Sequence, residues 1–344
     1  MKALVVDRPG CLVLADIPRP VPGDYDALVR VEVCGICNST DQRVIDGTMC
    51  YHSQYPAVLG HEGIGVVVET GRRVRSLRPG MRVTRPFAVL PGECRNGLWS
   101  AWGGFAEYGL ARDRLALAAD GYEAEASHFL VQRQNLVPDG LNPVDAALAI
   151  SMAEITSFLH KLGPLEGQTV VILGTGIAGL AMADIAKRLG AARTIVLGRR
   201  PERLWQARAC GADEAFLSDP TQIPAVRAAA GGDGADWLIE AVGDPGALAA
   251  WLGCLRPGGG VAVYGLADHH TYHLPLMGAP SDFHFHVPAP EDQRTYHWVC
   301  SLMLSGALDP RLFRSHIWQW PGEATAAFDA VRRRQVLKGF MVFP

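Results

Sequence analysis

The feature that most constrains this chain is a glycine-rich turn that directly follows a run of apolar, β-branched residues. The run Thr169–Leu173 has the composition of a strand buried on both faces, and Leu180–Leu189 after the turn has helical composition. The turn itself carries Gly174, Gly176 and Gly179. The first glycine allows a tight turn, the second lets the backbone approach a pyrophosphate, and the third lets the helix pack close to the strand. This order predicts the phosphate-binding start of a dinucleotide fold.

Downstream of the turn, runs of strand length alternate with alanine-rich segments of helical composition. The expected strands are Thr169–Leu173, Thr194–Leu197, Trp237–Ala241 and Val261–Tyr264, and the expected helices lie near 180–190, 202–211, 222–230 and 246–255. This alternation indicates a parallel, doubly wound sheet. After about residue 266 the alternation stops, and the proline- and histidine-rich stretch Asp268–Pro290 is expected to be irregular.

The N-terminal part, to about residue 140, has a different pattern, in which turn clusters separate short β-branched runs. The runs are Ala3–Val6, Ala27–Val33, Gly63–Thr70 and Arg82–Thr84. Turns such as Pro18–Gly23 lie between them, and the spacing predicts a compact, barrel-like antiparallel unit. Further helices are expected over Pro143–Leu162, 293–305 and 323–334, and a closing strand over Leu337–Phe343.

The composition limits the class of protein. A length of 344 residues suggests about two domains. A net charge of −3 predicts no strong attraction to nucleic acid or to anionic lipid. Charge follows Met1 too early for a secretory signal, and no apolar run approaches the roughly 18–20 residues of a membrane span, so we expect a soluble, cytoplasmic protein. The 8 cysteines are spread along the chain, which argues against a disulfide framework.

Six short segments combine with this order of elements into one pattern. They are Cys34–Cys37, Tyr55–Gly65, Trp102–Tyr108, Gly174–Gly179, Gly211–Asp213 and Arg256–Gly259. In this pattern the chain resembles the medium-chain dehydrogenase/reductase family, and within it the zinc-dependent alcohol and polyol (sorbitol-, threonine- and cyclitol-like) dehydrogenases. The resemblance implies an α/β fold with a GroES-like β-barrel catalytic domain at residues 1–142 and a doubly wound Rossmann domain at 143–283. A C-terminal return at 284–344 would complete the catalytic domain.

The resemblance also implies a catalytic zinc bound by Cys37 and His61, with Glu62 beside the metal. A thiolate and an imidazole make a tight site, and an open fourth position leaves room for water or a substrate oxygen. The family's third ligand falls near Ile150, which cannot bind a metal. Glu154 lies about one helical turn further on, on the same helix face, and is our candidate for the third ligand. The alternative is that Glu154 pairs with an arginine or lysine at the domain boundary.

The loop after Cys37 departs from the family pattern by one extra residue. Either Ser39 or Thr40 therefore supplies the hydroxyl that passes the substrate proton, and we favour Thr40 because it keeps the Thr-Asp pair of the family intact. Asp41 would be the carboxylate that orients a metal ligand. The histidine relay that the family has just downstream is replaced by Gln42 and Arg43.

A second, structural zinc is expected to be absent. Many relatives bind it in a lobe with four closely spaced cysteines, whereas the corresponding region, Arg85–Trp102, contains only Cys94.

The choice of nicotinamide cofactor depends on the end of the second strand of the dinucleotide fold. An acidic residue there selects NAD, and an arginine nearby accommodates the extra phosphate of NADP. The strand ends in Gly198, Arg199 and Arg200, and Arg203 follows one turn into the next helix. We therefore favour NADP(H) over NAD(H), although these arginines could instead stack on adenine without discriminating. The other expected cofactor contacts are Gly174, Thr175, Gly176, Ile177, Ala178, Gly179, Ala241, Val242 and Gly265.

These assignments predict reversible hydride transfer between a secondary alcohol and the nicotinamide, with a hydroxylated small molecule (a polyol, sugar or cyclitol) as the substrate. The histidines between His269 and His286 are expected to be loop residues without a metal-binding role. Family analogy suggests a homodimer or homotetramer. Two alternatives are a zinc-free NADPH-dependent enone or quinone reductase, and a non-catalytic nucleotide-binding protein.

Overall fold

In the computed structural model, residues 1–50, 52–265, 271–274 and 279–344 are described. Contacts divide the chain into two units, one of Met1–Ser151 with Gln293–Pro344 and one of Met152–Asp292. The chain thus leaves the first unit once and returns to it. Helix α5 (Pro143–His160) contains the first of these two boundaries.

The second unit is built on one parallel sheet, in the order β12-β11-β10-β13-β14-β15. Its strands are β10 (Thr169–Leu173), β11 (Arg193–Gly198), β12 (Glu214–Leu217), β13 (Ala235–Glu240), β14 (Leu255–Val263) and β15 (His284–His286). Every residue of β10 is buried, as its continuous apolar run predicts. The strand order is that of a doubly wound dinucleotide fold, so the predicted fold class is confirmed.

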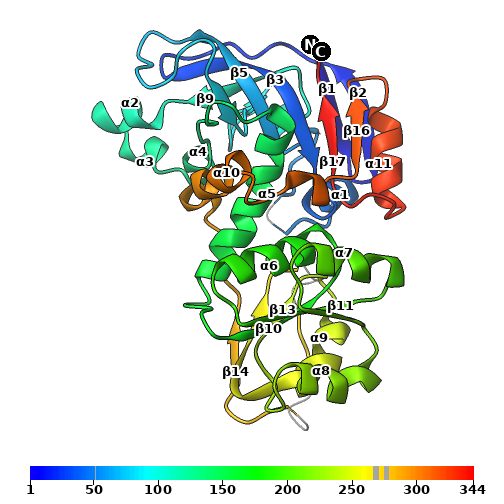
Figure 1. Ribbon diagram of the computed structural model, residues 1–344. Coiled ribbons are helices and arrows are strands. Elements are labelled where there is room, and N and C mark those ends of the chain that lie inside the picture. The colour runs from blue at the N-terminus through cyan, green and yellow to red at the C-terminus, as the bar shows by residue number, and fades with distance from the viewer. Residues whose placement is uncertain (51, 266–270, 275–278) are drawn as a thin grey trace. The chain divides into compact units, whose positions relative to one another are not determined.

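Helices cover both faces of this sheet, as Figure 1 shows. They are α6 (Ile177–Arg188), α7 (Leu204–Ala209), α8 (Ile223–Ala229) and α9 (Pro245–Trp251). On one face, Val226 of α8 and Trp251 of α9 pack with Val171 and Leu238 of the strands into a single core cluster. Helices α6 and α7 contact each other and β11 on the other face. Crossovers of this kind bury both faces of a parallel sheet.

Two strands of this sheet were not predicted from the sequence. Strand β15 lies within the stretch expected to be irregular, so that expectation is wrong for residues 284–286. It pairs with β14, where Gly260 faces His284, and its first two residues are exposed. Strand β12 also has exposed residues at both ends. Short, half-exposed edge strands lack the continuous apolar run that marks a buried strand, because only part of each strand packs against the core.

The first unit contains two sheets. One has the order β2-β1-β4-β8-β7, and the other has the order β16-β17-β3-β5-β6, with β9 also pairing with β3. Their strands are β1 (Lys2–Arg8), β2 (Cys11–Asp16), β3 (Asp26–Ile36), β4 (Ala57–Val58), β5 (Glu62–Thr70), β6 (Arg82–Thr84), β7 (Cys94–Arg95), β8 (Leu98–Ser100), β9 (Tyr108–Arg112), β16 (His316–Gln319) and β17 (Gly339–Val342). The pairing is not purely antiparallel as expected, because β4–β8 and β16–β17 are parallel.

The C-terminal strand β17 pairs with β3 in antiparallel register, so the last residues of the chain complete a sheet that begins near its start. In Figure 1 the red strand β17 lies between the orange β16 and the blue β3. The helices of this unit are α1 (Thr40–Asp46), α2 (Arg114–Ala119), α3 (Glu123–Ala126), α4 (Phe129–Gln132), α10 (Tyr296–Leu304), α11 (Ala324–Arg332) and the first part of α5. None of the helices in the described ranges is long and apolar enough to cross a membrane.

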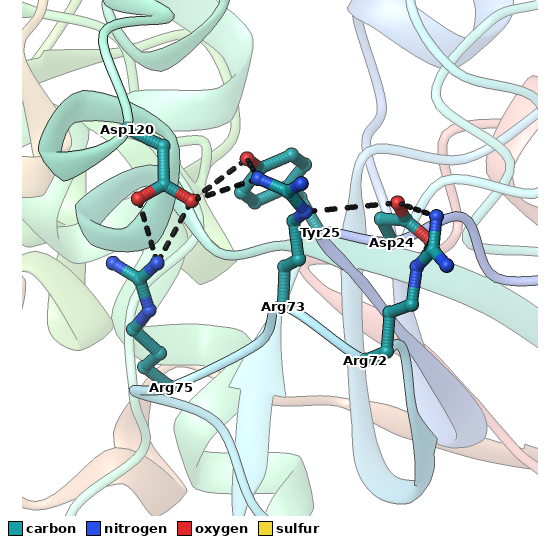
Figure 2. A network of polar contacts seen from close by, with 6 residues as sticks. All are labelled: Asp24, Tyr25, Arg72, Arg73, Arg75 and Asp120. Atoms are coloured by element: carbon teal, nitrogen blue, oxygen red, sulfur yellow. Dashed lines mark hydrogen bonds and ion pairs between the residues drawn. The ribbon is translucent and has the colours of Figure 1, made fainter.

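A charged network joins three loops of the first unit (Figure 2). Its members are Asp24, Tyr25, Arg72, Arg73, Arg75 and Asp120. The Arg72 guanidinium donates to both oxygens of Asp24 at 2.7 and 2.8 Å. Asp120 accepts from Arg75 at 2.6 Å and from the Tyr25 hydroxyl at 2.8 Å. The arginines are exposed, so water and salt weaken each ion pair, and the network mainly fixes loop geometry.

Candidate metal and cofactor sites

Cys37, His61 and Glu62 lie together in the first unit, where one ligand atom from each is within 4.8 Å of the others. Cys37 follows the end of β3, and His61 and Glu62 stand at the start of β5. These two strands pair so that Gly35 faces Glu62. A side chain at Gly35 would collide with the Glu62 carboxylate, so a glycine is needed there to leave room for it. Strand pairing therefore joins two predicted site segments that lie apart in the sequence.

Asp41 holds both predicted ligands from one buried carboxylate. Its Oδ2 accepts a hydrogen bond from the Cys37 backbone N–H at 2.9 Å, and its Oδ1 lies 2.9 Å from His61 Nδ1. Burial would lower the pKa of His61, but the charge and hydrogen bond of Asp41, together with contact with Cys37, raise that pKa well above its usual value. With Nδ1 engaged by Asp41, the other ring nitrogen is left for the cluster.

The two candidate hydroxyls differ in their surroundings. Ser39 is exposed and precedes the first residue of α1. Thr40 is half-buried, and its backbone N–H donates to Cys37 Sγ at 3.3 Å. This hydrogen bond places the backbone of Thr40 next to the Cys37 thiol.

Glu62 is held by two partners that the sequence did not reveal. Its Oε1 accepts from the Ser151 hydroxyl at 2.8 Å, and its Oε2 accepts from the buried ammonium of Lys338. Burial would raise the pKa of Glu62, but the charges of Lys338 and His61 and these hydrogen bonds lower it. The only sequence signal for Lys338 is a lysine set against a strand that is otherwise apolar.

The Trp102 ring is a further neighbour of the cluster, with its centroid 5.1 Å from that of the His61 ring. Its backbone has a φ of 66°, in the left-handed region that disfavours a bulky residue. The sequence places Trp102 in a family segment but does not reveal its contact with His61.

Glu154, the sequence-based candidate for a third metal ligand, belongs to the second unit and is half-buried on α5. Ile150, at the family's usual ligand position, is buried. The assignment of Glu154 stays a prediction.

The glycine turn of the second unit has the geometry that its sequence predicts. Gly174 has a φ of 122°, which favours glycine. A side chain at Gly179 would collide with the Gly174 carbonyl. At Gly176, which immediately precedes α6, a Cβ would have no atom within 4 Å, so the backbone there is open to a ligand. The N-terminus of α6 offers free N–H groups and a positive dipole end, which suit a pyrophosphate.

The arginine segment follows β11 and lies next to this turn. A side chain at Gly198 would collide with that of Thr175. Arg199 is exposed, whereas Arg200 and Arg203 are half-buried. Burial and then the nearby charge of Arg200 lower the pKa of Arg203. The two positive charges oppose each other, while the carboxylate of Glu202 partly offsets this effect on Arg203.

The remaining predicted cofactor contacts lie after β13 and β14. Ala241 and Val242 follow β13, and Gly265 follows β14. The Val242 side chain is exposed and lies next to the Gly174 turn. His269 and His270 lie outside the described residues, while His284 and His286 are in β15.

Comparison with known proteins gives two family matches. Residues 23–120 match the alcohol dehydrogenase GroES-like domain, and residues 178–281 match the zinc-binding dehydrogenase family. The L-threonine 3-dehydrogenase of Streptomyces coelicolor is 34% identical over 277 residues, which is 77% of each chain. The L-galactonate-5-dehydrogenase of Escherichia coli is 28% identical over 100% of this chain and 99% of its own. Among solved structures, the alcohol dehydrogenase TADH from Thermus sp. ATN1 is 26% identical, with a TM-score of 0.81 over 100% of both chains.

Proposed function

The chain belongs to the medium-chain zinc-containing alcohol dehydrogenase family and is a zinc-dependent, NAD(P)-dependent alcohol or polyol dehydrogenase, and we propose that it oxidises a secondary alcohol of a polyol, sugar or cyclitol with NADP(H). The cluster of Cys37, His61 and Glu62 carries the proposal, because it brings a thiol, an imidazole and a carboxylate together. This donor set suits zinc. The relatives named for L-threonine and L-galactonate support a hydroxylated substrate.

Cys37 and His61 would hold the metal, and either Glu62 or Glu154 would complete the protein ligands. When bound, zinc supplies a Lewis acid for the alcohol oxygen. Asp41 fixes the His61 ring by its Nδ1 nitrogen, and Lys338 balances the charge of Glu62. Glu62 already accepts hydrogen bonds from two partners, which favours Glu154 as the third metal ligand. The position of Glu62 within the cluster favours Glu62 instead.

The third ligand can be identified with a matched pair of variants, Glu62→Gln and Glu154→Gln. Each removes one negative charge and keeps the size of the side chain. The variant that loses bound zinc, measured by mass spectrometry of the dialysed protein, identifies the ligand. If Glu154→Gln keeps a full complement of zinc, Glu154 is not the ligand.

The Thr40 hydroxyl would lead the substrate proton out of the site. Thr40 is favoured over Ser39 because its backbone already contacts Cys37 Sγ. We expect Thr40→Val to lower kcat by about 100-fold and Ser39→Ala to lower it only slightly, since a positioned proton-transfer group is worth roughly 10²–10⁴-fold. The reverse ranking would assign the role to Ser39.

The preference for NADP(H) rests on Arg199, Arg200 and Arg203. A guanidinium pair at the end of β11 suits the extra phosphate of NADP, and no carboxylate stands at positions 198–200. We expect a lower KM for NADP than for NAD. Arg200→Ala should raise the KM for NADP about tenfold or more while the KM for NAD changes little, because a charge-assisted contact is worth more than one such factor in affinity. A clear preference for NAD in the unaltered enzyme would contradict this assignment.

The substrate class is tested by screening polyols, sugars and cyclitols with NADP and NAD, reading the absorbance of the reduced nicotinamide. The two competing functions are measured in the same plates, by adding enones and quinones with NADPH. Turnover of a secondary alcohol that stops on removal of zinc supports the proposal. Reduction of an enone by the zinc-free protein would favour the reductase, and cofactor binding without turnover of any compound would favour a non-catalytic role.

Three other sequence-based assignments remain proposals. One zinc per chain, without a structural zinc, is expected because the Arg85–Trp102 segment contains a single cysteine. A dimer or tetramer is expected by family analogy. The domain limits at residues 142 and 283 also remain predictions. Metal content per chain and light scattering measure the first two directly.

A further inference from the structure

Glu240 is a fully buried carboxylate at the carboxyl end of β13, in the second unit. Its Oε1 accepts hydrogen bonds from the backbone N–H groups of Val242 and Gly243, both at 2.7 Å, and from Asp244 at 3.4 Å. Its Oε2 accepts from the Tyr272 hydroxyl at 3.2 Å. One side chain therefore satisfies three successive backbone donors and a tyrosine.

Three successive N–H groups that point at one oxygen form a concavity of the kind that binds an anion. Here the chain fills it with its own carboxylate. Burial raises the pKa of Glu240, and the three N–H donors with the Tyr272 hydroxyl offset part of that effect. A buried carboxylic acid destabilises the fold unless its hydrogen bonds are formed. The hydrogen bonds to Glu240 therefore fix the conformation of the loop of residues 241–244.

This loop lies beside the glycine turn. Strand β13 pairs with β10 so that Glu240 faces Leu173, the residue before Gly174. Val242 Cγ2 lies 2.9 Å from the position that a Cβ on Gly174 would take. The exposed Val242 side chain thus stands over the first glycine of the turn.

The loop after β14 meets the same carboxylate. The backbone N–H of Gly265 donates to the Glu240 carbonyl at 3.0 Å. A side chain at Gly265 would collide with Glu240 Oε2 and with the Gly243 backbone. Tyr272, further along that connection, closes the arrangement through its hydroxyl. Glu240 therefore fastens two loops that follow neighbouring strands of the sheet.

The order of the sheet assigns these loops to one half of the cofactor. In a doubly wound sheet the dinucleotide lies across the carboxyl ends of the strands, with one nucleotide on each half. The half with β10, β11 and β12 carries Arg199 and Arg200, the candidates for contact with the adenosine ribose. The half with β13, β14 and β15 is left for the nicotinamide nucleotide.

We propose that Glu240, together with Tyr272, is a positioning residue for the nicotinamide half of the cofactor. Glu240 acts through the backbone of residues 241–244 and Gly265, and its carboxylate touches neither substrate nor cofactor. The inference rests on the proposed cofactor contacts of Ala241, Val242 and Gly265. It adds to them the group that holds all three in place.

The test compares a whole cofactor with a fragment that lacks the nicotinamide. Dissociation constants are measured by calorimetry for NADPH and for 2′-phospho-ADP-ribose, with NADH and ADP-ribose as the second pair. The proteins are the unaltered enzyme, Tyr272→Phe, Glu240→Gln and Glu240→Ala. Tyr122→Phe, an exposed tyrosine of the other unit, is the control for the aromatic change.

Tyr272→Phe is expected to raise the Kd of NADPH by about tenfold and that of the fragment by less than about twofold, because only the nicotinamide half loses its support. Glu240→Gln should stay within about threefold of the unaltered enzyme, since its amide oxygen still accepts the N–H groups. Glu240→Ala should show a larger selective loss than Tyr272→Phe. Should Glu240→Ala fail to fold, Tyr272→Phe and Glu240→Gln decide the matter.

Equal weakening of NADPH and the fragment in Tyr272→Phe would overturn the inference, and so would a lower melting temperature with unchanged NADPH affinity. If the unaltered enzyme binds the fragment but gains nothing from the nicotinamide, the positioning role fails while the adenosine site stands. If the unaltered enzyme binds neither NADPH nor the fragment, the proposed cofactor site itself fails. That outcome is distinct from those that overturn only the positioning role.

Discussion

Replacing Asp41 with asparagine should weaken zinc binding without unfolding the protein. The Asp41 carboxylate accepts from the Cys37 backbone with one oxygen and meets His61 Nδ1 with the other. An asparagine has one oxygen and one NH₂ group, so it cannot accept at both places. If the oxygen faces His61, the NH₂ group opposes the Cys37 N–H. If the amide is reversed, its NH₂ group donates to Nδ1, and the proton of the neutral ring moves to the nitrogen needed for the metal.

The magnitude follows from how a carboxylate supports a metal-bound histidine. Loss of such a partner typically weakens metal affinity by about 10–100-fold, which corresponds to about 1.4–2.7 kcal/mol. Asp41 contacts both predicted protein ligands, so we expect the upper part of that range. A buried donor left without an acceptor costs about 1–3 kcal/mol, so the free energy of unfolding should fall as well.

Zinc affinity is measured by competition with a chromophoric chelator at fixed pH, with the melting temperature recorded for each protein. Asp46→Asn is the matched control, because Asp46 is an exposed acid on the same helix, α1. A zinc Kd for Asp41→Asn within about threefold of the unaltered enzyme would refute the argument, since it would mean that the carboxylate does not orient the ligands.

Three further outcomes are expected. Cys37→Ser should abolish turnover and reduce bound zinc while the cofactor Kd stays nearly constant, as measured by metal analysis and calorimetry; full activity without metal would contradict this. Chelation of zinc should lower the melting temperature, because Cys37 and His61 lie at the ends of two different strands and the proposed metal site forms only in the folded protein. Asp113→Asn should cost about 2 kcal/mol near neutral pH, because the buried carboxylate accepts from Arg75 and Ser76 N–H groups, and chemical denaturation measures this. Burial raises the pKa of Asp113, but the hydrogen-bond donors lower that pKa overall. The contribution of Asp113 to the free energy of unfolding is therefore complete above about pH 4 and should fade as the pH falls through the lowered pKa. A cost of Asp113→Asn that does not change with pH would contradict this expectation.

The cofactor half of the protein could be read from the sequence because its signals are local. Strand β10 has the bounds that its apolar run predicts, and Gly174 and Gly179 occupy positions where a side chain would be strained or would collide. A strand, a turn and a helix that follow one another in the chain are fixed by neighbouring residues, so a short window contains the information. The Cys37 and His61 segments were found in the same way, as short family patterns.

What surrounds those residues was decided by the tertiary structure. Lys338 contacts Glu62 from 276 residues further along the chain, and Ser151 belongs to a helix that lies 89 residues from Glu62 in the sequence. The hydrogen bond from Tyr272 to Glu240 likewise joins two residues that lie 32 positions apart in the sequence. Strand β15 exists because β14 offers it a backbone to pair with. The sequence alone predicted the glycine turn and the residues proposed to bind metal, because these signals lie in short segments of neighbouring residues. The partners that charge, orient and support those residues arise from strand pairing and burial between distant segments, and only folding brings these together.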